Sequence, residues 1–158
     1  MDYGFFGEDL KPEEKGGKDC IVVAVMKEKI TGSRFAHVVT TKGGEDGYAA
    51  KSLAEDINCM GCRRVILKTD QEPAIQALGE RVAEHRKSVT VPELAPKGDP
   101  ASYGLAETGA REIADHARTI KLAMEGVLQC RIPLGHNIVP WIFEAASQQS
   151  NRYQVGRN

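Results

Sequence analysis

Three acidic residues could carry chemistry if the fold brings them together. Asp2 begins an aromatic-rich stretch, Asp70 ends the segment RRVILKTD, and Glu107 lies within a long alanine-rich segment. Carboxylates from separate elements can hold two Mg²⁺ ions, which prefer oxygen ligands and promote phosphoryl transfer. Each acid also has an ordinary explanation. Asp2 could be a polar strand end, Asp70 a turn residue, and Glu107 half of an i,i+4 ion pair with Arg111.

Basic residues near these acids are candidates for binding nucleic acid. Around a helix that turns about 100° per residue, Arg111 lies about 40° and Arg118 about 20° from Glu107. Arginines in such a position can act as charge-assisted donors to phosphate oxygens. Lys68 is a further candidate, and its alternative is an ordinary solvated lysine.

The elements that must position these residues follow from the hydrophobic pattern. Runs of β-branched and aromatic residues predict strands at 2–7, 20–26, 34–41, 63–70 and 88–94. Helical spacing predicts helices at 44–61, 72–87, about 104–125 and 136–153. Three strands followed by alternating helices and strands predict an α/β fold. We expect a mixed five-stranded sheet with helices on its faces.

Within these elements the acids have defined positions. An acid at the carboxyl end of a buried strand, such as Asp70, lies where α/β folds place their ligands. Asp2 and Gly4 point to the same side of their strand, which leaves an open spot beside the carboxylate. In the long helix, a stripe that includes Ala110, Ile113 and Ala117 predicts a buried face.

Charge and cysteine content restrict the possible functions. The formal net charge is -1, which argues against strong DNA binding by this chain without neighbouring domains. Cys59 and Cys62 form a CxxC pair, but a structural zinc site needs four ligands, and Cys20 and Cys130 stand alone. We therefore interpret the cysteines as small, reduced, apolar residues.

No targeting to a membrane or to secretion is expected. The sequence has no apolar run of about 18 residues, so no transmembrane helix is predicted. The first residues, MDYGFFGEDL, are acidic where a signal peptide is basic.

Taken together, the acids and their elements resemble the catalytic core of integrases from retroviruses and LTR retrotransposons. That family has an Asp on its first strand, a second Asp after a short apolar strand and a Glu on a long helix. The corresponding segments here are MDYGFFG, ILKTDQEPAI and SYGLAETGAREI. Asp70 and Glu107 stand 37 positions apart, close to the family spacing. The chain departs from the pattern at 71–73, where Gln-Glu-Pro replaces a small polar residue and a glycine.

The resemblance implies an RNase H-like fold and a catalytic, metal-binding triad of Asp2, Asp70 and Glu107. It implies two Mg²⁺ (or Mn²⁺) ions, Asp2 and Asp70 sharing one and Glu107 with Asp2 holding the other. The implied reactions are 3'-end processing and strand transfer of the element's cDNA into target DNA, in the nucleus and as a homo-oligomer. Residues 1–158 are then one core-like domain with a helical C-terminal segment from about 127, and we expect a fragment of a longer polyprotein.

Three other readings of the sequence stay open. Another RNase H-like nuclease or a transposase would share the metal chemistry and differ in substrate. A non-catalytic or decayed nucleic-acid-binding module suits the near-neutral charge and the residues after Asp70, because a fold alone does not fix a function. An unrelated α/β protein would require the order of elements to arise by chance.

Overall fold

The first three strands form an antiparallel meander. The computed structural model describes residues 1–11, 20–40, 42–43, 47–96 and 100–153, with backbone only for 100–103. The strands are β1 (Asp2–Phe6), β2 (Ile21–Lys27) and β3 (Arg34–Val39), in the order β1-β2-β3. In their register Tyr3 lies opposite Ala24, and Ala24 lies opposite His37. A short 3-10 turn, η1 (Glu8–Leu10), follows β1.

Helices and two parallel strands alternate through the rest of the chain. The elements are α1 (Tyr48–Cys59), β4 (Arg64–Thr69), α2 (Pro73–His85), β5 (Val89–Leu94), α3 (Pro100–Leu128) and α4 (Ile138–Tyr153). Strands β4 and β5 pair in parallel, with Ile66 opposite Val91. The predicted α/β class and the order of elements are confirmed. The predicted helical residues 44–46 and the strand end at Thr41 lie outside the described residues.

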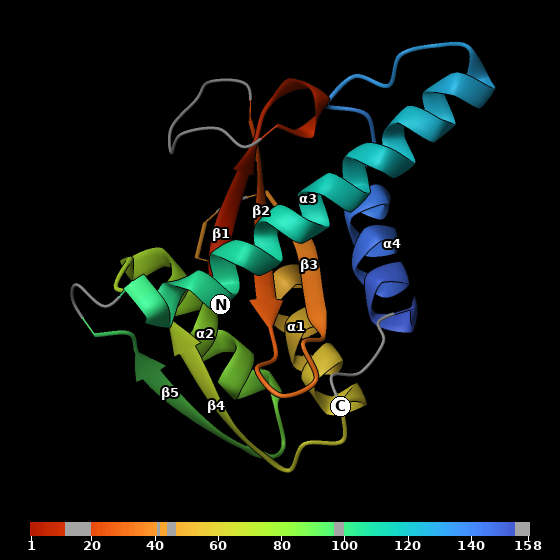
Figure 1. The fold of residues 1–158 in the computed structure, drawn as a ribbon. Coiled ribbons are helices and arrows are strands. Elements are labelled where there is room, and N and C mark those ends of the chain that lie inside the picture. The colour runs from red at the N-terminus through yellow and green to blue at the C-terminus, as the bar shows by residue number, and fades with distance from the viewer. Residues whose placement is uncertain (12–19, 41, 44–46, 97–99, 154–158) are drawn as a thin grey trace.

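The five strands of the predicted mixed sheet are present, but they do not form one continuous ladder. The five strands form a three-stranded and a two-stranded sheet. The Met1 amino nitrogen donates a hydrogen bond to the Lys68 carbonyl oxygen at 2.6 Å, so the start of β1 lies beside the end of β4. Figure 1 shows that the end of β4 lies near the N-terminus, where β1 begins. The two strands therefore overlap only at their ends, and such an overlap is too short for a ladder.

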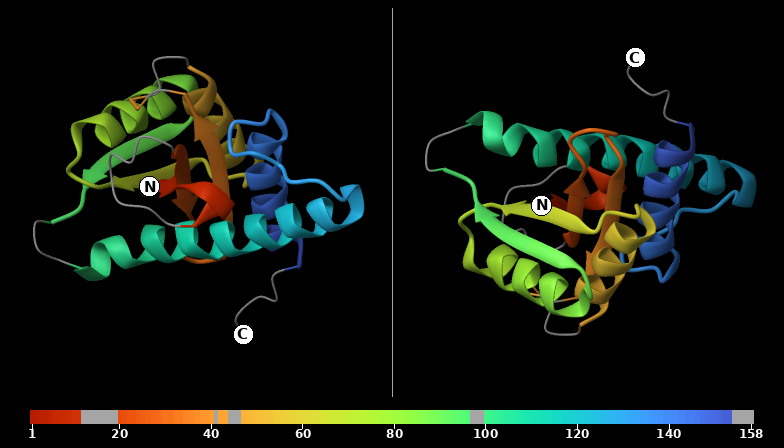
Figure 2. Two further views of the ribbon diagram at one scale, coloured as in Figure 1. Left: turned by 90° about the horizontal axis from the view of Figure 1, so that it is seen from above. Right: turned by 90° about the horizontal axis from the view of Figure 1, so that it is seen from below.

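Helices cover both faces of the meander (Figure 2). One core cluster joins β1–β3 to α1 and α2, with Leu53 and Leu78 completely buried. A second cluster joins the opposite face of the same strands to α3 and α4, with Ile113 and Phe143 completely buried. The alternation of side chains along β1 assigns Tyr3 to the first cluster and Phe6 to the second.

The long helix agrees with its predicted stripe but starts earlier. Ile113 and Ala117 are buried, and Ala110 packs against the same cluster. The helix begins at Pro100 rather than near residue 104, since proline is well tolerated in the first turn of a helix. Across the described parts of the chain, none of the helices combines the length and apolar character needed to cross a bilayer.

Candidate metal-binding site

Helix α3 crosses β1 very closely, directly over Gly4. A Cβ atom placed on Gly4 would lie 3.6 Å from the Cβ of Ala110 and 2.6 Å from the buried ring of Phe6. A side chain at this position would therefore collide with the Phe6 ring, and it would touch Ala110 of α3 at ordinary contact distance. Asp2 points to the same side of β1 as Gly4, and Glu107 lies one helical turn before Ala110. Both acids thus belong to the side of the meander that α3 covers.

This close approach gives a stability prediction. We expect Gly4→Ala to lower the free energy of unfolding by about 1–3 kcal/mol, because an added methyl group overpacks a filled core. Urea denaturation measures the change. Gly126→Ala in α3 is the matched control, since a Cβ there has no neighbour within 4 Å, and it should raise stability by up to about 1 kcal/mol. Equal stability of the wild type and Gly4→Ala would contradict the close packing of the Phe6 ring against Gly4.

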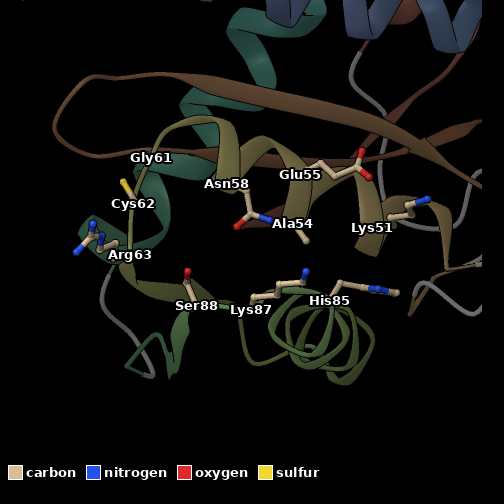
Figure 3. A pocket seen from close by; sticks show the side chains of 10 residues that line it. All are labelled: Lys51, Ala54, Glu55, Asn58, Gly61, Cys62, Arg63, His85, Lys87 and Ser88. Carbon is tan, nitrogen blue, oxygen red and sulfur yellow. The ribbon is translucent and has the colours of Figure 1, made fainter.

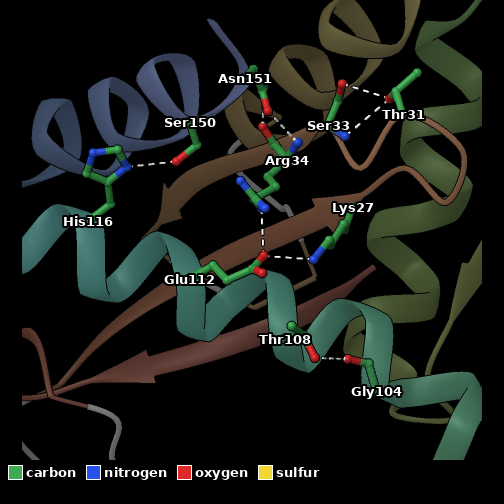
Figure 4. A network of polar contacts seen from close by, with 10 residues as sticks. All are labelled: Lys27, Thr31, Ser33, Arg34, Gly104, Thr108, Glu112, His116, Ser150 and Asn151. Carbon is green, nitrogen blue, oxygen red and sulfur yellow. Dashed lines mark hydrogen bonds and ion pairs between the residues drawn. The ribbon is translucent and has the colours of Figure 1, made fainter. Parts of the chain in front are cut away.

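A charged network fixes α3 on the sheet (Figure 4). The Glu112 carboxylate accepts hydrogen bonds from Lys27 Nζ and Arg34 Nε, both at 2.7 Å. Burial raises the pKa of Glu112, but the two cations outweigh this effect, so its pKa lies below the ordinary value. Asn151 of α4 bonds to the backbone of Arg34 in both directions, at 2.7 and 2.6 Å. The helix that carries Glu107 is therefore held at a defined position.

Asp2 and Asp70 lie close to the same group, the Met1 amino nitrogen. Burial lowers the pKa of this amine from 8.0 to about 6, while the charges of Asp2 and Asp70 act in the opposite direction. Each carboxylate also accepts a hydrogen bond from the next backbone N–H, of Tyr3 at 2.7 Å and of Gln71 at 2.5 Å. Because Met1 bonds to Lys68, Asp2 and Asp70 stand one and two residues from the same contact, and their convergence on a metal ion stays a prediction.

Glu107 is engaged differently. Its carboxylate pairs with Arg111 Nη2 at 3.2 Å, and the two side chains are 67% and 65% exposed. This is the i,i+4 ion pair that the sequence analysis gave as the alternative to a metal-binding role for Glu107. Exposed pairs of this kind contribute little stability, so Glu107 can leave Arg111 at small cost. Within the described ranges, no three His, Cys, Asp or Glu side chains converge closely enough to hold a metal ion. The triad remains a prediction.

The other candidate cations have structural partners. Arg118 donates from Nε to the Asp9 carbonyl at 3.3 Å, from Nη2 to the Leu10 carbonyl at 3.2 Å, and from Nη1 to Asp115 at 3.0 Å. It thereby holds η1, in which Asp9 and Leu10 have positive φ angles of 59° and 56°. Lys68 pairs with Glu93 across β4 and β5 at 3.1 Å. Contact of either residue with DNA stays a prediction.

Sequence reasoning missed a polar cluster centred on His37. The imidazole bridges Asp56 of α1 at 2.7 Å and Glu144 of α4 at 3.2 Å. The Tyr48 hydroxyl donates to the same Glu144 oxygen, and the Tyr48 ring meets the His37 ring edge-on at 6.0 Å. Two carboxylates on opposite sides of one imidazole cannot share a metal ion through it. We interpret this cluster as a tie between α1, β3 and α4.

The cluster predicts a pH dependence of stability. Burial lowers the pKa of His37, but hydrogen bonds and charge attraction from Asp56 and Glu144 outweigh it and raise the pKa above 6.5. A raised folded pKa means that the stabilisation is complete below 6.5 and is lost as pH rises through the folded value. Urea midpoints between pH 6 and 9 should therefore fall more steeply for the wild type than for His37→Gln. Parallel profiles would refute this role.

Comparison with known proteins supports the fold. No protein-family model matches the chain, and no curated protein sequence matches it. Among solved structures, it is similar to one described as the crystal structure of the catalytic core domain of BIV integrase in crystal form I. The identity is 17%, the TM-score is 0.54, and the alignment covers 99% of this chain and 85% of that one. The predicted resemblance is confirmed at the level of the fold: this chain has the RNase H-like fold of an integrase catalytic core.

Proposed function

We propose that this chain is the catalytic core of a DNA-integrating enzyme that processes 3' ends and transfers strands by metal-dependent phosphoryl transfer. The observation that carries the proposal is the junction of β1 and β4, where Met1 bonds to Lys68, so that Asp2 and Asp70 stand one and two residues from the same contact. The second support is the integrase-type fold. The third is the crossing of α3 over Gly4, which keeps Glu107 on the same side of the meander as Asp2.

The donor set suits Mg²⁺ or Mn²⁺. All three acids offer carboxylate oxygens, the ligands that such hard cations prefer. Asp2 and Asp70 both lie near the contact between Met1 and Lys68, and Glu107 needs only to leave its exposed pair with Arg111. Asp2 and Asp70 would hold one ion, and Asp2 with Glu107 the second. When bound, such ions supply an activated hydroxyl nucleophile and neutralise charge on the leaving oxygen.

The protein's own residues then bind and orient the substrates, the element's cDNA ends and target DNA. Arg111, freed from Glu107, becomes available to a phosphate oxygen. Lys68, which is exposed enough to exchange Glu93 for DNA, lies two residues before Asp70. Arg118 keeps η1 in place and contacts DNA only if it releases Asp115. Assembly as a homo-oligomer and action in the nucleus follow from this function alone.

A joining assay tests the proposal. The purified chain is incubated with a fluorescent duplex that has a recessed 3' end, with a target duplex, and with Mg²⁺, Mn²⁺ or EDTA. We expect joined products with either metal and none with EDTA. Cleavage of an RNA–DNA hybrid without any joining would instead assign the chain to the RNase H-like nucleases.

A non-catalytic nucleic-acid-binding module is the second candidate. The Glu107–Arg111 pair favours it, as does the lack of any three converging metal-ligand side chains in the described parts of the chain. Calorimetric titration with Mn²⁺ separates the two candidates. Stoichiometric binding that the Asp70→Asn variant loses supports the enzyme. A folded chain without metal affinity supports the binding module.

A further inference from the structure

A basic cavity lies far from the acids, at the opposite end of β4. Its volume is about 560 Å³, and it lies between α1, α2 and the turns that follow them (Figure 3). Arg63 at its edge directly precedes β4, whereas Asp70 follows the last residue of that strand. A strand of six residues spans about 20 Å. The cavity is therefore separate from the candidate metal site.

The charge of the cavity differs from that of the whole chain. Its described lining includes three permanent cations, Lys51, Arg63 and Lys87, against one carboxylate, Glu55, whereas the complete chain has a formal charge of -1. Within the described parts of the chain, no side-chain hydrogen bond or ion pair engages any of these three cations. Figure 3 shows the Lys87 amine at the hollow and Lys51 and Arg63 at its two ends. Unpaired positive charge in and beside a hollow attracts an anion.

Neutral donors join these charges in the centre of the cavity. The Asn58 Oδ1 atom accepts a hydrogen bond from Arg86 Nε at 3.3 Å, which leaves the Asn58 amide N–H groups for the cavity. Figure 3 shows the Asn58 amide and the Ser88 hydroxyl pointing into the hollow, with the Lys87 amine between α1 and α2. These groups can all donate hydrogen bonds, so the centre of the cavity is suited to an acceptor-only ligand.

Arg86 gives this arrangement its rigidity. The side chain is buried, with 6% exposure. Besides Asn58 it binds the Thr90 hydroxyl at 2.7 Å and the Cys62 carbonyl at 2.8 Å. It thus ties α1, the turn after α1 and β5 together behind the cavity. These hydrogen bonds hold the walls of the cavity in place before a ligand binds.

The ends of α1 and α2 offer another explanation for the cations, because helix C-termini attract positive charge. At the end of α1, however, backbone groups already bind the carbonyls. Gly61, with a φ of 73°, donates to the Asn58 carbonyl at 2.9 Å, and Met60 donates to that of Asp56 at 3.2 Å. At the end of α2, Arg86 N donates to the Ala83 carbonyl at 3.2 Å. The cationic side chains remain available to an external anion.

We propose that this cavity binds a phosphate group. A phosphate offers several acceptor oxygens and negative charge, which matches the Lys87 amine and the neutral donors at the centre, while Lys51 and Arg63 add positive charge at the two ends of the cavity. The phosphate can belong to a small phosphorylated molecule or to a nucleic-acid backbone, and both present the same chemistry. The proposal is independent of the catalytic function proposed above.

A nuclear magnetic resonance titration of the full chain with pyrophosphate tests the site. The buffer contains no divalent metal, so pyrophosphate cannot bind through a metal ion held by Asp2, Asp70 and Glu107. We expect saturable shifts of the Asn58 side-chain amide and the Ser88 backbone amide. Lys87→Gln should weaken binding about tenfold, since one charge-assisted hydrogen bond is lost. Lys29→Gln, at another exposed lysine, is the matched control and should bind as the wild type does.

Two further arms identify the source of the phosphate. If a short single-stranded oligonucleotide displaces pyrophosphate, a nucleic-acid backbone fits the site. If it does not, the site takes a small phosphorylated molecule. Asp70→Asn should retain pyrophosphate binding, so this site and the catalytic proposal can fail separately. No saturable shift at Asn58 and Ser88, or equal affinity in Lys87→Gln and the wild type, would overturn the proposal.

Discussion

Asp70→Asn is expected to abolish metal-dependent DNA joining while leaving the fold intact. The substitution keeps the size of the side chain and the oxygen that accepts the Gln71 N–H, but it removes the negative charge. A metal ion contributes several kcal/mol of charge stabilisation in the transition state. Losing it therefore slows joining about a hundredfold to a thousandfold or more. Rates measured under single-turnover conditions with Mg²⁺ report this loss.

Glu80→Gln is the matched control for this variant. Glu80 is an exposed carboxylate of α2, the helix that follows Asp70, and its neutralisation should leave the joining rate unchanged. Circular dichroism and the urea midpoint establish that both variants are folded. A joining rate of Asp70→Asn equal to that of the wild type would remove Asp70 from the mechanism.

The second large effect is expected at Phe143. This side chain of α4 is completely buried, and its ring centroid lies 5.3 Å from that of Phe6 on β1. Truncation to alanine removes the transfer free energy of the ring and leaves a cavity between α4 and the sheet. We expect Phe143→Ala to lower the free energy of unfolding by about 3–5 kcal/mol. Because natural domains are stable by only about 5–15 kcal/mol, this is a large share of the total.

Trp141→Ala, in the same helix, is the matched control. Its side chain is larger, but it is 68% exposed, so the change in unfolding free energy should stay within about 0.5 kcal/mol. Urea denaturation of both variants gives the comparison. A similar loss in both variants would show that α4 responds to any truncation rather than to the contact with Phe6.

Much of the fold follows from local sequence patterns. The β-branched run CIVVAVM and the stripe through Ile113 and Ala117 form the predicted strand and the predicted buried helix face. These patterns are local because the period of each element decides which side chains are buried. The split into two sheets could not be predicted. It depends on how far β1 is displaced from β4 along the strand axis, and the hydrophobic pattern of each strand does not encode this displacement.

The candidate site was predictable in part. The sequence indicated that Asp70 follows a strand, and in the structure Asp70 follows β4, two residues after the Lys68 carbonyl that Met1 binds. The structural role of Arg118 could not be predicted, because its partners are backbone carbonyls more than 100 residues away. They belong to a turn with positive φ angles at Asp9 and Leu10, where no glycine indicates such a conformation. The His37 cluster was missed for a similar reason. Its two carboxylates come from α1 and α4, which are 19 and 107 positions away from His37 in the sequence.

The paired hydrogen bonds between Arg34 and Asn151 have a consequence for synthesis on the ribosome. These residues are 117 positions apart, and α4 covers one face of the first sheet. At 5–20 residues per second, translation needs roughly 6–23 s to pass from one residue to the other. During that interval the apolar face around Val23 and Val25 is made, but α4 does not yet cover its share of it. The nascent chain therefore exposes part of this apolar face until α4 has been synthesised.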